Sequence, residues 1–404
     1  MHNNKNKATA FSSPDFNRYF AASAFLTLAT WMTRFLVGWM TWDLTASALW
    51  VGVVSASMLV PTLFLSPYFG VLADRVNARN GMVLIHMSEA LLALATSLAS
   101  VFGYFSLHWL LLLALLLGGL SAAQHPMRLV LLPKLVDREL FPSAIGLAST
   151  TYNASRVLGP ALAAWLLLTV GVAAAFLAVA ALLLAGLLLI LRLKVTSSPS
   201  FDCSQPVLQA LLQGFRVALM TPLIRLVLIL TMIDGLLGRS VMELLPAISG
   251  QLIGGNAATL AKLTALAGAG SILGGVLVSR LRGKEARLLR LVLAALLGCS
   301  LILLSVMAVR ELVGLGGMIM LLSLAVTMIG TGCQALIQLC IADQYRGRVL
   351  SIWTVVSLGV PALGAFVIGA AADAFGFRTV LLCAALLGAA SVLATVNKYR
   401  LVRP

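Results

Sequence analysis

Apolar runs of about 20 residues recur along the whole chain, separated by short polar breaks. A helix of that length crosses the roughly 30 Å hydrocarbon core of a bilayer. Charged residues make up only 10% of the sequence, against roughly a quarter in soluble domains, so no stretch is left for a soluble domain. The breaks predict twelve transmembrane helices, near 19–43, 47–72, 82–101, 107–128, 143–167, 171–192, 222–248, 258–279, 288–309, 313–339, 349–372 and 378–397.

The composition of these runs favours helices over a membrane β-barrel. The runs are continuously apolar, whereas barrel strands alternate between apolar and polar residues, and Ala, Leu and Gly dominate them. The fold class is therefore expected to be all-α and integral to the membrane. The polar first 16 residues lack the apolar core of a signal peptide, so no cleavage is expected there.

The net charge of +15 comes from basic residues in the termini and in alternate loops. The opposite loops hold little beyond Lys262, Arg310 and Arg378. This asymmetry follows the positive-inside rule and predicts that both termini are cytoplasmic. The charge therefore indicates topology, and no nucleic-acid partner is expected.

The sequence offers no cluster typical of a metal site or an enzyme. The five cysteines and four histidines are scattered, without disulfide or metal-ligand spacing. A membrane enzyme such as a lipid-modifying transferase would need a motif like H-E-x-x-H, and a nucleotide-driven pump would need a phosphate-binding loop; neither motif occurs. We expect no cofactor, no metal and no catalytic residues, with an ion gradient, by default protons, as the energy source.

An internal repeat organises the chain. The sequence Gly-Val-Leu at 70–72, followed by Arg75, returns at 275–277, followed by Arg280, an offset of 205 residues. Pro-Ala-Leu likewise begins at Pro160 and again at Pro361. Two parallel repeats of six helices follow. The predicted domains are an N-terminal bundle, a cytoplasmic linker that is partly disordered and partly a surface helix, and a C-terminal bundle, at 1–193, 194–221 and 222–404.

At this point the sequence resembles the major facilitator superfamily. The signature of that family between helices 2 and 3, G-x-L-x-D-R followed by basic residues, is matched in "GVLADRVNARNGM" by Gly70, Leu72, Asp74, Arg75 and Arg79. The stretches "HPMRLVLLPKLVDREL", "NASRVLGPAL" and "DQYRGRVLSIW" are similar to the branch containing the enterobactin exporter and macrolide efflux proteins. The resemblance implies two pseudo-symmetric six-helix bundles, alternating access, and a cavity lined mainly by helices 1, 4, 7 and 10.

The resemblance also implies a cytoplasmic gate built from Gly70, Asp74, Arg75 and Arg79. Asp74 would accept hydrogen bonds from the amino terminus of helix 11, whose dipole favours a negative charge. The second repeat has Ser279 at the position of Asp74, so this latch is expected in the first half alone. Asn77 suits a tight loop, because Asn tolerates a positive φ better than most residues do. Arg75 and Arg79 have the alternative role of topology signals alone.

Span 1 carries polar residues at helical spacing, namely Thr27, Thr30, Arg34, Gly38 and Thr41. A mid-membrane charge costs at least about 2.5–3.5 kcal/mol, so we expect Arg34 to face a wet cavity, the alternatives being a structural ion pair or snorkelling. In span 5, Arg156 lies mid-membrane, and Gly159 with Pro160 is a candidate hinge that can also pack closely. Arg156 could instead join helix 5 to a neighbour.

Three isolated carboxylates are the candidates for proton coupling: Asp234, Glu243 and Glu89. Arg239 and Glu243 are four residues apart and can pair, whereas Asp234 is expected on nearly the opposite face of an α-helix from Glu243. Glu89 is the weakest candidate for substrate contact, because helix 3 is peripheral in the resembled fold.

The expected substrate cavity contains more basic than acidic groups. Its candidate residues are Arg34, Thr30, Gln124, Arg156, Arg239, Gln334 and Gln338. Guanidinium groups bind carboxylates and a positive cavity concentrates anions, so we expect a monomeric, proton-coupled exporter of an anionic siderophore in a bacterial inner membrane. The two glutamines could equally make interhelical hydrogen bonds. The alternatives for the chain are a multidrug or macrolide efflux antiporter, a lipid flippase and a downhill permease.

Overall fold

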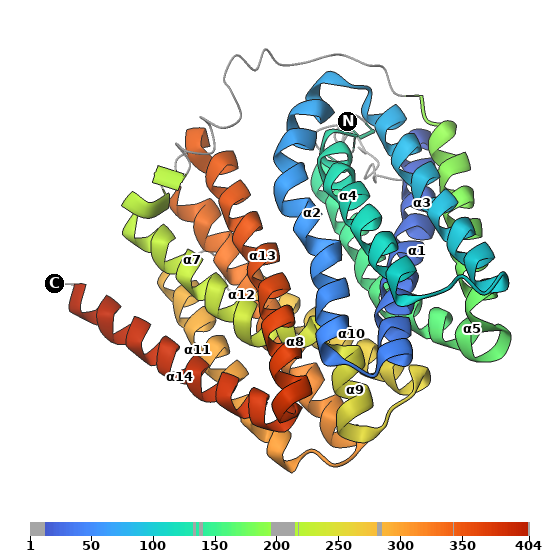
Figure 1. Cartoon of the computed structure of the whole chain (residues 1–404). Helices are drawn as coiled ribbons and strands as arrows, with labels where there is room; N and C mark the ends of the chain where they lie inside the picture. The colour runs from blue at the N-terminus through green and yellow to red at the C-terminus, as the bar shows by residue number, and fades with distance from the viewer. Residues whose placement is uncertain are drawn as a thin grey trace, which may run out of the picture. The chain divides into compact units, whose positions relative to one another are not determined.

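The computed structural model describes residues 13–131, 135–136, 140–194, 215–216, 218–280, 285–341 and 343–402. Every regular element in these ranges is a helix (Figure 1). In hydrocarbon, a helix satisfies its own backbone hydrogen-bonding groups, which an isolated strand cannot do. The all-α prediction is confirmed.

The first six predicted spans appear as α1 (Pro14–Thr45), α2 (Ala48–Arg75), α3 (Ala78–Val101), α4 (Leu107–Leu131) and the long α5 (Phe141–Leu191). Two helices are merged in α5, because its backbone turns at Gly171, with φ 85° and ψ 177°. Few residues other than glycine tolerate that conformation. Spans 5 and 6 were therefore correctly predicted as separate helices.

Span 7 was expected to be one helix at 222–248, and the structure divides it. The order is α7 (Pro222–Asp234), a π-helix η3 (Gly235–Arg239), α8 (Ser240–Glu243) and α9 (Leu245–Ile253). The last break lies at Leu244, whose φ of −91° and ψ of 8° leave the helical region. Pro246 follows it and has no amide proton to continue the preceding helix.

The remaining spans are α10 (Ala257–Ser279), α11 (Glu285–Leu304) extended by η4 (Ser305–Ala308), α12 (Leu312–Cys340), α13 (Asp343–Phe375) and α14 (Phe377–Val402). Gly376, at φ 77°, makes the turn between the last two. All twelve predicted spans thus correspond to helices or helix groups. Most of the predicted linker, 195–214 and residue 217, lies outside the described residues.

The chain divides into two compact units. Unit 1 comprises residues 1–37 and 64–203, and unit 2 comprises 38–63 and 204–404. The hairpin formed by the end of α1 and the start of α2 therefore packs with the C-terminal helices. The domain boundaries expected from the repeat stay a prediction.

In unit 1, glycines on α5 allow close approach to α1. A Cβ atom on Gly159 would lie 2.7 Å from Cβ of Trp31, and one on Gly186 would lie 2.7 Å from Leu26. Ser97 on α3 also donates a 2.8 Å hydrogen bond to the Ala173 carbonyl. Small residues that bring backbones together are the usual basis of helix packing in membranes.

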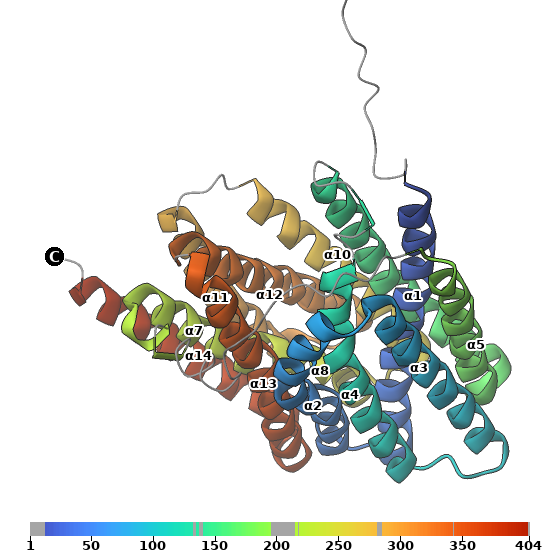
Figure 2. The same cartoon turned by 90° about the horizontal axis from the view of Figure 1, so that it is seen from above.

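Unit 2 uses the same device between α10 and α12, which lie side by side (Figure 2). A Cβ atom on Gly270 would overlap the Met320 carbonyl oxygen. Ser323 donates a 2.6 Å hydrogen bond to the Ala267 carbonyl, and Thr327 donates one of 2.9 Å to Ser271. These hydroxyl bonds and the missing side chain hold the two helices in one register.

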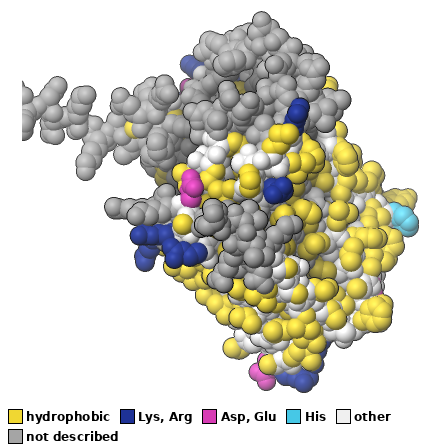
Figure 3. All heavy atoms as spheres, turned by 90° about the vertical axis from the view of Figure 1, so that its left-hand side faces the viewer, with side chains coloured by type: hydrophobic (Ala, Val, Ile, Leu, Met, Phe, Trp, Pro, Cys, Tyr) yellow, Lys and Arg dark blue, Asp and Glu magenta, His cyan; other side chains and the backbone are white. Residues whose placement is uncertain are grey.

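The outer surface is apolar, as lipid contact requires. Large hydrophobic side chains such as Val313 and Phe64 are 84% and 76% exposed, and hydrophobic groups dominate the described part of the face in Figure 3. Ten described helices are long and apolar enough to cross a membrane, the merged α5 counting once. The protein is a multi-pass membrane protein.

We predict that Gly270→Ala destabilises the protein and that Gly275→Ala, on the same helix, does not. The first Cβ atom would overlap α12, whereas nothing lies within 4 Å of the second. Overpacking of this kind costs about 1–3 kcal/mol. The measurement is the free energy of unfolding of each variant in detergent micelles; equal values for the two would contradict the proposed packing.

Candidate substrate and proton-coupling site

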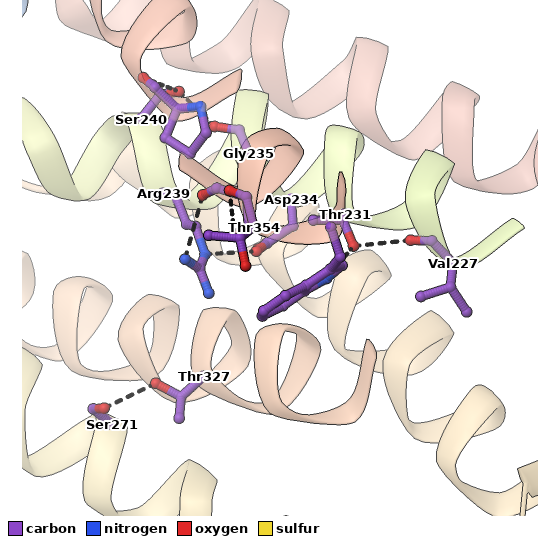
Figure 4. Close-up of polar contacts among 12 residues, drawn as sticks. Val227, Thr231, Asp234, Gly235, Arg239, Ser240, Ser271, Thr327 and Thr354 are labelled. Carbon is purple, nitrogen blue, oxygen red and sulfur yellow. Dashed lines mark hydrogen bonds and ion pairs between the residues drawn. The ribbon is translucent and has the colours of Figure 1, made fainter. Parts of the chain in front are cut away.

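The π-helix η3 brings Asp234 and Arg239 together. Arg239 Nε donates to Asp234 Oδ2 at 3.2 Å (Figure 4). In a regular α-helix, residues five apart are rotated by about 140°, whereas the i→i+5 turn of a π-helix places them on one face. The sequence prediction assumed α-helical geometry, in which Arg239 and Glu243 can pair and Asp234 lies on nearly the opposite face from Glu243. The π-helix adds the contact between Arg239 and Asp234, which that geometry does not predict.

Ser240 stabilises the wide turn. Its Oγ donates to the Gly235 carbonyl at 2.5 Å and lies 3.3 Å from the Pro361 carbonyl on α13. A Cβ atom on Gly235 would come within 2.8 Å of Val360. Close packing against α13 thus accompanies the π-helix.

Pro361 leaves one backbone carbonyl of α13 without its helical donor, and this carbonyl binds Arg239. A proline inside a helix donates no hydrogen bond to the carbonyl four residues earlier, which here is Ser357. That carbonyl accepts instead from Arg239 Nη1, at 3.5 Å. The Pro-Ala-Leu repeat therefore marks, in this half, a backbone acceptor used by a guanidinium group.

The two charged groups differ in their access to the surroundings. The Asp234 side chain is 1% exposed and the Arg239 side chain 30%. Asp234 Oδ1 has no hydrogen-bond partner among the described residues. A buried carboxylate oxygen without a partner is costly. The pair thus combines a buried carboxylate with a partly accessible cation.

The neighbours of the pair make room for it. A Cβ atom on Gly330 of α12 would overlap Arg239 Nη2. Trp353 Nε1 donates to Thr231 Oγ1 at 3.1 Å, one turn before Asp234. Small and aromatic groups therefore surround the ion pair on the sides facing α12 and α13.

The polar residues of α12 have different surroundings. Thr327 binds Ser271 of α10, so this residue joins helices. Gln334 and Gln338 have exposed side chains. Their assignment to the substrate cavity stays a prediction.

In unit 1, Arg34 and Arg156 both lie against Trp31. Each guanidinium carbon is 5.6 Å from the Trp31 ring centroid, within the range of a cation–π contact. Tyr152 meets the same ring edge-on, with centroids 5.5 Å apart. An aromatic cluster thus orients two arginines from helices far apart in the sequence.

The tight packing of Gly159 on Trp31 agrees with the expected close packing, and the hinge role of Gly159 and Pro160 stays a prediction.

The polar residues of span 1 do not all have the same surroundings. Thr27 shares a 2.9 Å hydrogen bond with Ser155 of α5, and Thr30 bonds back to the Leu26 carbonyl. Thr41 is fully buried. Gln124 on α4 is half-buried, as are Thr30 and Arg34. The assignment of Thr30, Arg34 and Gln124 to a substrate cavity stays a prediction.

Glu89 has a partner within its own helix. His86 Nδ1 and Glu89 Oε2 are 2.8 Å apart, and both side chains are buried. His86 Nε2 has no hydrogen-bond partner among the described residues. Glu243 is half-buried, and its carbonyl accepts a 3.4 Å bond from Ser55. Of the candidate carboxylates, Asp234 forms a described ion pair with an arginine, Arg239.

The predicted cytoplasmic gate is described in part. The side chains of Asp74 and Arg75 lie outside the described residues. Arg79 donates to the carbonyls of Ile190 at 3.2 Å and Leu191, at the end of α5. This contact gives Arg79 a structural partner at a helix C-terminus, where a cation is favoured. No atom lies within 4 Å of a Cβ position on Gly70.

Asn77 lies directly before α3. Its φ is −67°, and its side chain accepts from the amides of Arg79 and Asn80, so it is the N-cap of α3. Asn77 does lie in the short loop between α2 and α3, but its suitability comes from capping, which needs an extended backbone, and not from a positive φ.

Sequence reasoning missed Trp31, Trp353 and Ser357 as partners of the charged groups. Trp31 was detectable, because it lies three residues from Arg34 and hence on the same helix face. The other two contacts join distant segments and leave no local signal. Among the described residues no group of three or more His, Cys, Asp or Glu could hold a metal ion.

Comparisons with known proteins agree with this architecture. The model of a family described as "Transmembrane secretion effector" matches residues 7–402. The staphyloferrin A transporter of Staphylococcus aureus (strain NCTC 8325 / PS 47) is 26% identical over 370 residues, covering 89% of this chain and 90% of the relative.

Solved transporter structures have the same fold. The nucleoside transporter NupG superposes with a TM-score of 0.73 at 13% identity, covering 95% of this chain and 99% of that one. A bacterial homologue of the lysosomal transporter Spinster, inward-facing and occupied, gives 0.73 at 15% identity, covering 95% and 96%. A POT family transporter in complex with a thioalcohol-conjugated peptide gives 0.74 at 12% identity, covering 96% of each chain. At these identities the likeness establishes the fold alone.

We predict a non-additive effect of removing the ion pair. Arg239→Gln leaves the buried Asp234 carboxylate without its cation, and breaking a buried pair costs up to about 3–5 kcal/mol. The double change Asp234→Asn with Arg239→Gln should recover most of that loss, because no buried charge remains. The free energies of unfolding of the four proteins in detergent test this; additive losses would contradict a direct interaction.

Proposed function

Because the chain belongs to the transmembrane secretion effector family of the major facilitator superfamily, we propose that it exports an anionic siderophore by proton-coupled alternating access. The protein is a transporter, not an enzyme. The proposal concerns the substrate, the direction and the coupling. It includes a monomeric protein in a bacterial inner membrane, with both termini in the cytoplasm, the orientation that the basic residues of alternate loops favour.

The observation that carries the proposal is the pairing of an accessible Arg239 with a buried, protonatable Asp234. A substrate carboxylate and Asp234 are alternative partners for the same guanidinium group. Gain or loss of a proton at Asp234 changes how strongly the carboxylate attracts Arg239, and so changes how this guanidinium group can meet an anionic substrate. Proton and substrate binding are thereby linked.

Arginines in unit 1 support an anionic substrate. The guanidinium groups of Arg34 and Arg156 both lie against Trp31, so two cationic groups meet at one place in unit 1. A guanidinium group can bind a carboxylate in bidentate fashion. The similarity to a staphyloferrin A transporter points in the same direction, toward a siderophore.

We predict that inverted vesicles containing the protein accumulate a carboxylate siderophore and not ethidium. Arg239→Ala should weaken siderophore binding roughly ten- to a hundredfold, because a hydrogen bond to a charged group contributes about 1.5–3 kcal/mol. Arg34→Ala should also weaken it, and Arg239→Lys should recover part of the binding but not the bidentate geometry. Ethidium transport without siderophore transport, insensitive to these changes, would instead indicate a multidrug exporter.

The coupling role predicts a separable defect in Asp234→Asn. An amide cannot exchange a proton, so transport driven by an imposed pH gradient should fall to background. Exchange of labelled for unlabelled siderophore, which needs no net proton movement, should continue. Glu89→Gln and Glu243→Gln are the matched changes, and we expect both to retain gradient-driven transport. Full gradient-driven transport in Asp234→Asn would exclude this coupling site.

A further inference from the structure

Asp373 closes a contact between the end of α13 and the start of α2. Its carboxylate accepts from Ser47 Oγ at 2.5 Å, from the Ala48 amide at 2.7 Å and from the Leu49 amide at 3.0 Å. The first amides of a helix have no partners within the helix and attract negative charge. Asp373 therefore caps α2 from a helix more than 320 residues away in the sequence.

Two glycines extend this contact along both helices. A Cβ atom on Gly52 of α2 would overlap the carbonyl oxygen of Ala365, and one on Gly369 of α13 would overlap the carbonyl oxygen of Ala48. The two backbones thus touch reciprocally, and Val51 between these contacts is fully buried. We call residues 47–52 together with 365–373 the clasp.

The clasp holds a segment of the N-terminal helices within unit 2. Residues 38–63 belong to unit 2, yet α1 and α2 continue without interruption into unit 1. Alternating access separates the two halves of a transporter at one end at a time. If the halves separate at the end where α1 turns into α2, either the clasp breaks or the end of α1 and the start of α2 come apart from each other.

We propose that the clasp is a gate that opens in each transport cycle, and that Asp373 is the residue that keeps it closed. This inference rests on the proposed alternating access, and the proposed topology places the gate on the extracellular side. Three hydrogen bonds at a helix end and a glycine crossing can open and re-form, because the Asp373 side chain is exposed and water can replace its partners.

The clasp has no counterpart at the repeat-related position. The equivalent helix start, that of α10, is capped by its own Asn256, which accepts from the Thr259 amide at 3.0 Å. Residue 172, related to Asp373 by the offset between the two Pro-Ala-Leu segments, is Val172. The contact is therefore specific to one of the two repeat-related ends.

The test measures access to the clasp directly. Val51→Cys places a thiol on the buried face, and a membrane-impermeant maleimide added outside right-side-out vesicles reports its exposure, relative to the parent chain with its native cysteines. Adding Asp373→Ala should raise the labelling rate roughly three- to thirtyfold, the factor expected for loss of a helix cap. Asp43→Ala, which removes an exposed carboxylate near the same loop, should leave the rate unchanged. An unchanged rate with Asp373→Ala would overturn the proposal.

A second variant does not depend on Asp373. Gly52→Ala puts a methyl group against α13 and should also speed labelling of Val51→Cys, whereas Gly298→Ala, with nothing within 4 Å, should not. Equal rates for these two would refute the role of the glycine crossing. Labelling needs no transported substrate, so a negative result here is distinct from a failure to observe siderophore export.

Discussion

In the hydrocarbon layer, every backbone amide or carbonyl that loses its helical partner must find another within the protein. The structure meets this requirement at each departure from regular helix that matters for function. The carbonyl freed by Pro361 is bound by Arg239, and the widened turn of η3 is bridged by Ser240. At the start of α2, the exposed amides are bound by Asp373. The polar side chains at these places thus stabilise backbone irregularities, and the irregularities in turn orient the polar side chains.

In each unit, glycines and hydroxyl groups bring particular helix pairs into close contact. The α10–α12 pair combines Gly270 with the Ser323 hydrogen bond, whereas the α2–α13 crossing combines two glycines with one aspartate. In lipid the apolar side chains gain little from leaving their surroundings, so close backbone contact and hydrogen bonds determine which helices stay together. A contact fixed by buried hydroxyls suits a permanent pair, and one fixed by an exposed aspartate suits a pair that separates.

The sequence predicted the helices well because hydrophobicity adds up over 20 residues and tolerates local errors. It even located the break at Gly171, since an apolar run of that length exceeds one membrane crossing. It did not predict the π-helix, because "GLLGR" contains no residue that excludes an α-helix and the widened turn accompanies packing on α13. The contact of Asp373 with α2 is equally invisible, because it joins segments over 320 residues apart. Asn77 shows a smaller limit: its residue type suits a left-handed turn and an N-cap equally, and only the backbone distinguishes them.

The repeat also explains why proton sensitivity belongs to one half in the proposed cycle. The 205-residue offset of the loops relates Arg239 to Arg34, and it relates Asp234 to Ala29. Both halves thus present an arginine at the same repeat position, held by different partners. Arg239 is held by a carboxylate, whose attraction depends on protonation, and Arg34 by Trp31, whose attraction does not. A change in the protonation of Asp234 therefore acts on the arginine of the second half, whereas the contact of the first-half arginine with Trp31 does not respond to that proton.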